Sequence, residues 1–456
     1  MMEFRIEHDS LGEVKVPKDA LFGPQTQRSL HNFNIGRTMP MEVIYALLKI
    51  KKAVAFVNHD NQTLDDEKYA AIKKAIDQLI DGDYTDAFPL HVYQTGSGTQ
   101  TNMNVNEVVA NLANQINPDA HVHPNDDVNQ SQSSNDTFPT AMMMAAYQAT
   151  NRVIHTVESL IDSLDKKQTE FASIIKIGRT HLQDATPITV GQEISGWKST
   201  LQHDVITLNA IKDSLLELPI GGTAVGTGLN TKSGFDQDVV NTINKNENTS
   251  YKVASNKFHG LADHSEITSV HGIFKTLASD LIKIGNDIRF LASGPRAGYN
   301  ELSIPSNEPG SSIMPGKVNP TQIEALTMVS AKVFGNDATI TFANSQGNFE
   351  MNVYKPIIID SFLESAELLN ESIKSFTEKL VDGLKVNIDR INELLKNSLM
   401  LVTALSPHIG YEKSAKIAQW AEQNSTTLKV SAMHFDISED DFEKWVNVQN
   451  MTHPNK

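Results

Sequence analysis

The sequence predicts an all-α fold built around a bundle of long helices, and two observations support this prediction. Apolar residues recur at intervals of three and four positions across residues 194–215, 270–291 and 362–380, which is the spacing of one face of an α-helix. A shorter stretch of the same kind covers residues 153–164. At least four striped helices therefore lie in one region, and helices of that length bury their stripes by packing side by side.

The length of the chain favours an elongated subunit of three domains over one small core. A chain of 456 residues exceeds the size at which a single core usually stops growing. We expect a mostly helical N-terminal domain over residues 1–136, a central domain of long helices over 137–395 and a small helical C-terminal domain over 396–456. Residues 1–45 should form an irregular, partly extended arm, and the apolar spacing within 41–82 predicts two helices.

The C-terminal stretch contains shorter predicted helices, with breaks expected at Pro407 and Gly410. Two short helices around a turn could form a DNA-binding helix-turn-helix. The acidic run at residues 439–441 and the overall net charge of −16 both oppose binding to DNA. A small cap domain is the better interpretation.

The composition excludes several classes of protein. The chain has no cysteine, which removes disulfides, zinc–thiolate sites and cysteine-bound iron–sulfur clusters. The negative charge opposes nucleic-acid backbones and anionic membranes. The first 14 residues resemble neither a signal peptide nor a transit peptide, and no window approaches the roughly 18 apolar residues of a membrane span. We therefore expect a cytoplasmic protein.

A loop at residues 310–320, here called the signature loop, carries the strongest functional signal. Its glycines and prolines prevent a regular helix or strand. Between them lie two hydroxyls, Ser311 and Ser312, one cation, Lys317, and one amide, Asn319, which together can hold a small carboxylate. A flexible connector would carry only small polar filler, whereas this loop also holds apolar residues and three spaced prolines.

A second polar cluster, residues 94–107, contains Gly96, Ser97, Gly98 and Thr99. The Gly-x-Gly pattern suggests a nucleotide loop, but no strand-like run precedes it and the third glycine and the phosphate-binding lysine are missing. Taken alone, the hydroxyls and amides could simply cap the apolar helix that follows.

A third polar cluster precedes the longest predicted helix. Ser133, Ser134 and Asn135 could bind a carboxylate together with the free N–H groups of the first helical turn. Upstream, His121 and His123 form a His-x-His pattern, but the sequence places no third metal ligand beside them.

Two further insertions lie between the predicted helices. His181, within residues 178–185, would as a lone histidine more often be structural than catalytic. The glycine-rich stretch 221–228 is typical of close backbone packing between helices.

The signature loop resembles that of the fumarase/aspartase superfamily, and the resemblance extends over essentially the whole chain. Residues 94–107 resemble its first motif and residues 178–185 its second. Within the superfamily, the chain resembles the class II fumarases. Gly96–Gln100 has their form of the first motif, His181 stands where aspartases have glutamine, and residues 315–322 match their loop.

The resemblance implies reversible hydration of fumarate to (S)-malate, as in the tricarboxylic acid cycle, through an aci-carboxylate intermediate and without cofactor or metal. It implies a homotetramer that pools its long helices and shares sites between subunits. An aspartate ammonia-lyase, or a structural protein such as the lens crystallin related to argininosuccinate lyase, is the alternative.

The resemblance also implies roles for individual residues. Ser311 is the expected base. His181, oriented by Glu324, is expected to exchange protons with the attacking water and the leaving hydroxyl. Lys317, together with Asn319 and the Ser312 amide, is expected to stabilise the charge that develops on the substrate carboxylate. The expected carboxylate-binding residues are Ser97, Thr99, Ser133, Ser134, Asn135, Thr180, Ser312 and Asn319. A secondary dicarboxylate site is expected at His123, Pro124, Asn125 and Asp126.

Overall fold

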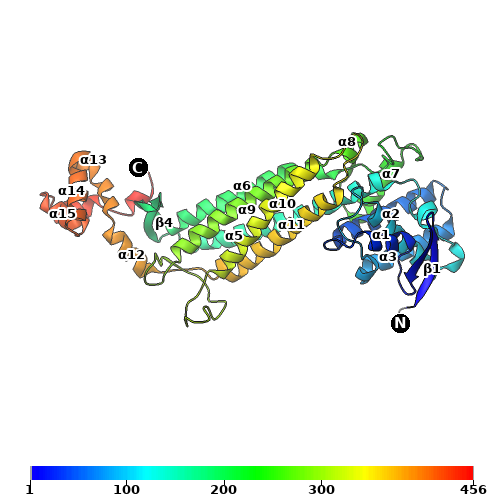
Figure 1. Ribbon diagram of the computed structural model, residues 1–456. Coiled ribbons are helices and arrows are strands. Elements are labelled where there is room, and N and C mark those ends of the chain that lie inside the picture. The colour runs from blue at the N-terminus through cyan, green and yellow to red at the C-terminus, as the bar shows by residue number, and fades with distance from the viewer. Residues whose placement is uncertain (1–2, 455–456) are drawn as a thin grey trace. The chain divides into compact units, whose positions relative to one another are not determined.

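A computed structural model describes residues 3–454, and it is mainly helical, as the sequence predicts (Figure 1). The chain divides into two compact units. The first unit comprises residues up to 154 together with 206–276 and 331–369, and the second comprises 155–205, 277–330 and the residues from 370 onward. The division into three domains stays a prediction. No helix within the described range 3–454 is long and apolar enough to cross a membrane.

The first unit begins with a hairpin and a short helix. Strands β1 (Phe4–Asp9) and β2 (Gly12–Pro17) pair antiparallel, which agrees with the expected extended arm. Helix α1 (Pro24–Asn32) was not predicted. The buried Glu107 carboxylate accepts hydrogen bonds from the backbone N–H groups of Gly23, Gln25 and Thr26, and so satisfies the first turn of α1 from a distant part of the chain.

The core of the first unit lies between helices α2 (Met41–Asp60), α3 (Asp66–Asp81) and α4 (Thr99–Ile116). Helices α2 and α3 confirm the two helices predicted over residues 41–82. The smaller elements of this unit are η1 (Thr85–Ala87), η2 (Pro118–Ala120), the π-helix η3 (Pro124–Val128), η4 (Lys212–Leu216), the parallel strands β5 (Glu217–Leu218) and β6 (Lys252–Val253), α7 (Phe235–Glu247) and α8 (Lys257–Ala262).

Five long helices contribute residues to both units. They are α5 (Ser134–Glu170), α6 (Val190–Ile211), α9 (Ser265–Leu291), α10 (Thr321–Asn344) and α11 (Lys355–Phe376). Helices α5, α6, α9 and α11 confirm the striped stretches. Buried side chains such as Leu201 and Leu281 occupy the stripes, as expected for mutual packing.

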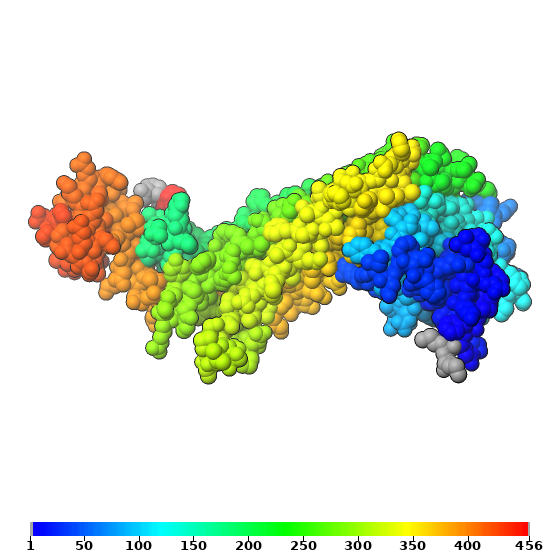
Figure 2. Space-filling view, viewed as in Figure 1, coloured from blue at the N-terminus to red at the C-terminus, as the bar shows by residue number. Residues whose placement is uncertain are grey.

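Helix α10 carries apolar residues around its whole circumference, so no one-sided stripe marked it in the sequence. Ile323 and Leu326 are fully buried, while Met328 and Phe342 remain 68% and 63% exposed. In Figure 2, α10 appears in yellow on the visible surface.

The second unit adds short strands and a group of short helices. Strands β3 (Ile175–Thr180) and β4 (Gln183–Thr189) form an antiparallel hairpin, and β7 (Leu302–Ser303) pairs with β8 (Lys385–Val386). The remaining elements are η5 (Thr377–Val381), α12 (Ile388–Asn397), η6 (Leu399–Ala404), α13 (Ser406–Ile409), α14 (Tyr411–Gln423), α15 (Leu428–His434), α16 (Glu439–Trp445) and η7 (Asn450–Thr452). The predicted break at Gly410 separates α13 from α14, whereas Pro407 lies in the first turn of α13, where proline is tolerated.

Candidate active-site residues

The signature loop connects β7 to α10 and is irregular, as predicted. Gly310 has φ +88°, and a Cβ there would lie 2.0 Å from the carbonyl oxygen of Lys317, so only glycine fits. Gly310 also bridges to Pro315. The loop therefore folds back on itself and places Gly310 beside Pro315 and Lys317.

Two backbone N–H groups donate hydrogen bonds to the hydroxyl oxygen of Ser311. Ser311 Oγ accepts hydrogen bonds from the N–H groups of Met314 over 3.2 Å and Ile313 over 3.4 Å. Hydrogen bonds of this kind favour the negatively charged form of an oxygen. The geometry therefore suits a serine that must give up its proton.

The cation and the amide of the loop lie together. Lys317 Nζ donates to Asn319 Oδ1 over 2.6 Å, and the Ser311 N–H donates to the Lys317 carbonyl over 3.3 Å. Ser312 and Lys317 are exposed, and Glu324 is exposed in the first turn of α10. In the part of the chain that the structure describes, Glu324 makes no hydrogen bond or ion pair with His181.

His181 lies at the tip of the β3–β4 hairpin, directly after Thr180. His181 and Leu182 form the two-residue turn, and their φ angles are +57° and +59°. Such a turn favours glycine and asparagine, so these residues hold a conformation that costs roughly 1–3 kcal/mol each. Uncommon backbone conformations of this kind cluster at functional sites.

A cavity of about 600 Å³ lies beside this hairpin in the second unit. Its lining combines His181 with two cations, three carboxylates and large aromatic side chains: Arg179, Lys283, Glu193, Asp280, Asp287, Trp197 and Tyr299. The exposed imidazole of His181 is therefore accessible to a small polar molecule.

In the first unit, the loop that carries Ser97 and Thr99 is packed tightly. Ser97 Oγ and Thr99 Oγ1 share a hydrogen bond of 2.8 Å. A Cβ on Gly96 would lie 1.3 Å from the carbonyl oxygen of Val353. Gly98, at φ +78°, is the N-cap residue of α4.

The capping alternative is confirmed for an amide of this cluster but not for the hydroxyls of Ser97 and Thr99. Gln94 Oε1 accepts from the N–H and the hydroxyl of Thr101 in the first turn of α4. Ser97 and Thr99 therefore keep hydroxyls that are not used by the helix terminus.

The third polar cluster spans the start of α5, since Ser133 precedes the helix and Ser134 and Asn135 are its first two residues. Both local and long-range contacts hold these residues. Ser134 Oγ accepts from Asn102 Nδ2 over 3.1 Å, and Ser133 Oγ accepts from the N–H of Asn135 over 3.2 Å. Asn135 Nδ2 donates to the carbonyl of Ala224 over 2.8 Å. The three residues form a fixed group, here called the clamp.

Asp136, which sequence reasoning missed, anchors the clamp. Its carboxylate accepts backbone hydrogen bonds from Ser133 over 3.0 Å and from Gly221 and Thr223 over 2.9 Å each. Burial raises the pKa of Asp136, and these hydrogen bonds act in the opposite direction. The glycine-rich stretch 221–228 thus does more than pack closely, because it holds the clamp in place.

The expected secondary site begins the π-helix η3. His123 Nδ1 accepts from the N–H of Asp126 over 3.1 Å, and Pro124 occupies the first turn. His123, Asn125 and Asp126 are exposed. His123 therefore has a local capping role, and its role in binding stays a prediction.

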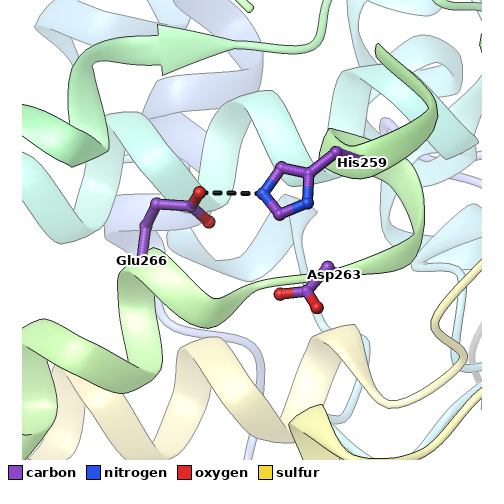
Figure 3. Close-up of side chains that lie close together, drawn as sticks. All are labelled: His259, Asp263 and Glu266. Carbon is purple, nitrogen blue, oxygen red and sulfur yellow. Dashed lines mark hydrogen bonds and ion pairs between the residues drawn. The ribbon is translucent and has the colours of Figure 1, made fainter. Parts of the chain in front are cut away.

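One cluster has the composition of a metal site, and it lies apart in sequence from the predicted residues. His259, Asp263 and Glu266 bring ligand atoms within 4.8 Å of one another. In Figure 3 the His259 imidazole points at Glu266, with Nε2 and Oε1 2.8 Å apart. This hydrogen bond raises the pKa of His259, which favours the protonated ring that cannot bind a metal. Asp263 accepts from the Ser265 N–H and so caps α9, and we assign the cluster a structural role.

The predicted residues fall into two groups. Ser97, Thr99, the clamp and His123–Asp126 belong to the first unit. Thr180, His181, the signature loop and Glu324 belong to the second. That these groups form a common site stays a prediction.

Comparison with protein families gives two matches. A family described as "Lyase" matches residues 12–335, and one described as "Fumarase C C-terminus" matches residues 401–453. The chain is 53% identical over 460 residues to "Fumarate hydratase class II" of Bacillus subtilis, and 54% identical over 463 residues to that of Halalkalibacterium halodurans. Each alignment covers 99% of this chain and 100% of the relative.

Solved structures show the same similarity. The class II fumarase from Schistosoma mansoni has a TM-score of 0.96 and 42% identity, with complete coverage of both chains. A fumarate lyase:delta crystallin from Brucella melitensis, bound to cobalt, has a TM-score of 0.95 and 38% identity, and covers 99% of this chain and 100% of its own.

Proposed function

This chain belongs to the class II fumarate hydratases, lyases that reversibly hydrate fumarate, and from that premise we propose how its residues carry out the reaction. The substrate is a small dicarboxylate. The difficulty in forming fumarate from malate is removal of an unactivated C3 proton beside a carboxylate. The resulting carbanion must spread onto that carboxylate, so donors and a cation placed there stabilise the transition state more than the substrate.

Ser311 is the base in this proposal. The observation that carries it is the pair of backbone N–H groups directed at Ser311 Oγ, from Ile313 and Met314. They would stabilise the alkoxide that removes the C3 proton, and Lys317 in the same loop would add a positive charge. Lys317, Asn319 and the N–H of Ser312 would then stabilise the aci-carboxylate.

His181 is the general acid that protonates the leaving hydroxyl in this proposal. It would deliver a proton to that hydroxyl, directly or through a water, so that malate loses water and fumarate is released. Glu324 would orient the imidazole. In hydration the same groups work in reverse, with His181 accepting a proton from water and Ser311 returning one to C3.

The remaining residues hold the carboxylates. Ser97, Thr99 and Thr180 would supply hydroxyls, and the clamp would supply hydroxyls, an amide and the N–H groups at the start of α5. His123, Pro124, Asn125 and Asp126 would form a separate, more superficial dicarboxylate site.

We propose that the enzyme is a homotetramer with sites shared between subunits. Support comes from the apolar surface of the isolated chain, because monomers rarely expose large apolar patches. Phe342 on α10 is 63% exposed and lines an apolar cavity of about 790 Å³ in the first unit, with Phe33, Ile35 and Tyr354. Helix α10 would be buried on all sides by neighbouring copies.

The ultraviolet absorbance of fumarate tests the function directly. Malate should generate fumarate and fumarate should be consumed, whereas aspartate should give no change. Turnover of aspartate would indicate an ammonia-lyase, and silence with both substrates a structural protein. The same activity after EDTA treatment is expected, because the proposed groups need no metal. Chelator-sensitive turnover restored by a metal would overturn the acid–base mechanism.

A further inference from the structure

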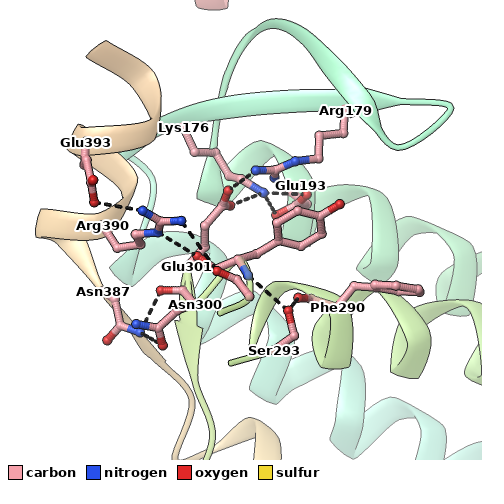
Figure 4. A network of polar contacts seen from close by, with 12 residues as sticks. Lys176, Arg179, Glu193, Phe290, Ser293, Asn300, Glu301, Asn387, Arg390 and Glu393 are labelled. Atoms are coloured by element: carbon pink, nitrogen blue, oxygen red, sulfur yellow. Dashed lines mark hydrogen bonds and ion pairs between the residues drawn. The ribbon is translucent and has the colours of Figure 1, made fainter. Parts of the chain in front are cut away.

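A buried cluster of charges in the second unit joins the β3–β4 hairpin to the chain that enters the signature loop (Figure 4). Glu301 immediately precedes β7, and its side chain is 1% exposed. Its carboxylate pairs with Lys176 Nζ over 2.9 Å and with Arg179 Nη2 over 2.5 Å, both from β3. Lys176 also pairs with Glu193 of α6 over 2.8 Å.

The backbone around Glu301 is fixed on both sides. The Glu301 N–H donates to the Leu291 carbonyl over 2.8 Å, and its own carbonyl accepts from the Asn387 N–H over 2.9 Å. Arg390 Nε donates to the Tyr299 carbonyl over 3.1 Å. The backbone that carries the Glu301 side chain is therefore fixed, and the buried carboxylate is not a mobile surface charge.

Arg179 depends on Glu301. Its guanidinium stacks over the Tyr299 ring, 4.4 Å from the centroid. Arg179 Nη1 is buried without an acceptor among residues 3–454, so Glu301 supplies the hydrogen-bonded carboxylate for this charge. A buried guanidinium that loses its carboxylate is costly, which makes the pairing specific.

Arg179 lies two residues before His181. The turn formed by His181 and Leu182 has the left-handed backbone described above, and local propensity does not favour it. Contacts at the base of the hairpin must therefore hold the turn. Arg179 is paired in register with Asp184 across the hairpin, and only the Thr180–Gln183 pair lies between them and that turn.

We infer that Glu301 is a positioning residue for the reaction: through Arg179 it fixes the His181 turn relative to the root of the signature loop. This inference rests on the proposed function, in that it assigns His181 to the chemistry. Glu301 itself does not touch substrate.

Glu301→Asp tests the inference because it keeps the buried charge and shortens its reach by one methylene. A displacement of about 1 Å can cost about 10²-fold in rate. We expect kcat to fall about 10- to 100-fold with KM changed less than about threefold. Glu393→Gln is the control, since it removes a carboxylate that pairs with Arg390 elsewhere in this network and leaves Arg179 and Glu301 paired; its kcat should stay within about threefold of wild type. Equal losses in both variants would overturn the inference.

Arg179→Lys is the second variant, should Glu301→Asp fold poorly. Lysine keeps the charge but loses the planar fork and the stacking on Tyr299. The same loss in kcat is expected, and wild-type kcat in this folded variant would overturn the inference.

A double-mutant cycle separates positioning from general damage. If Glu301 acts through His181, then Glu301→Asp should have little further effect on kcat in a His181→Asn background. Independent, multiplicative losses would overturn the inference while leaving the proposed function intact.

Hydrogen exchange gives a readout that does not require turnover. Backbone amides of residues 179–183 should exchange faster in Glu301→Asp than in wild type or Glu393→Gln. Unchanged exchange would overturn the inference. If the wild type failed to hydrate fumarate, the proposed function would fall, and exchange would still show whether Glu301 holds the turn.

Discussion

Asp136 Oδ2 accepts a hydrogen bond of 2.9 Å from the backbone N–H of Thr223, a residue 87 positions later in the chain. The same oxygen accepts from Gly221. The start of α5 and the glycine-rich stretch are therefore joined at one buried carboxylate, immediately behind the clamp.

Asp136→Asn should weaken both the fold and substrate binding. Asparagine offers one acceptor oxygen where the carboxylate offers two, so at least one buried N–H loses its partner, at a cost of about 1–3 kcal/mol. We expect KM for fumarate to rise about tenfold or more. The free energy of unfolding, measured in urea, should fall by the same amount, about 1–3 kcal/mol. Asp238→Asn, at an exposed position on α7, is the control. An unchanged KM would show that Asp136 does not position the clamp.

Ser311→Ala should leave the protein folded and lower activity by several orders of magnitude. The hydroxyl lies in an exposed loop and contributes little to packing, whereas a general base contributes about 10²–10⁴ in rate. Steady-state kinetics with malate and the unfolding transition measure the two effects. Activity above a tenth of wild type would remove Ser311 from the role of base.

His181→Asn should reduce kcat far more than His123→Asn. We assign His181 to the reaction and His123 to a separate binding site, where it also caps η3. The two variants remove the same chemical group, so they control for each other. Comparable losses in kcat would mean that the assignment of the two sites is wrong.

Asp204→Asn should stabilise the protein above pH 7. Asp204 is 4% exposed, and burial, followed by the nearby Asp280 carboxylate, raises its pKa from 3.8 to about 7. Between these values the folded state holds a proton that the unfolded chain has lost, so the free energy of unfolding falls as pH rises through this window. Three pK units correspond to at most about 4 kcal/mol.

Urea unfolding of the Asp204→Asn variant at pH 4 and pH 8 measures this effect. The free energy of unfolding of the variant should exceed that of the wild type at pH 8, and the two values should differ little at pH 4. Asp165→Asn, at an exposed position, is the control. Parallel pH profiles for wild type and Asp204→Asn would contradict the prediction.

Mixed refolding tests whether sites are shared between chains. Inactive Ser311→Ala and His181→Asn chains, denatured and refolded together, should regenerate some sites with both native residues, at most about a quarter under random assortment. Neither parent refolded alone should recover activity. Differently tagged chains show whether mixed oligomers form; if they form and stay inactive, Ser311 and His181 act from the same chain.

The sequence predicted those parts of the protein that depend on local pattern. Regular apolar spacing marked α2, α3, α6 and α9, and the glycines and prolines marked the signature loop. Helix α10 escaped notice because it is apolar on all sides. Asp136 and Glu301 could not be identified, because their partners lie far away in the chain: Thr223 for the first, and Lys176 and Arg179 for the second. The hairpin turn at His181 and Leu182 could not be predicted, because it contains neither glycine nor asparagine, the residues that usually indicate such a turn.

The packing at Gly96 sets a different limit on how this protein can diverge. The nearly coincident Val353 carbonyl leaves no room for any side chain at position 96, whereas the neighbouring Ser97 is a buried residue whose hydroxyl bonds to that of Thr99. Any substitution at position 96 must therefore displace the Val353 backbone, whereas Ser97→Ala removes a single hydroxyl. Under relaxed metabolic selection we expect Ser97 to change before Gly96, so that a surviving Gly96 would record the fold after the activity had gone.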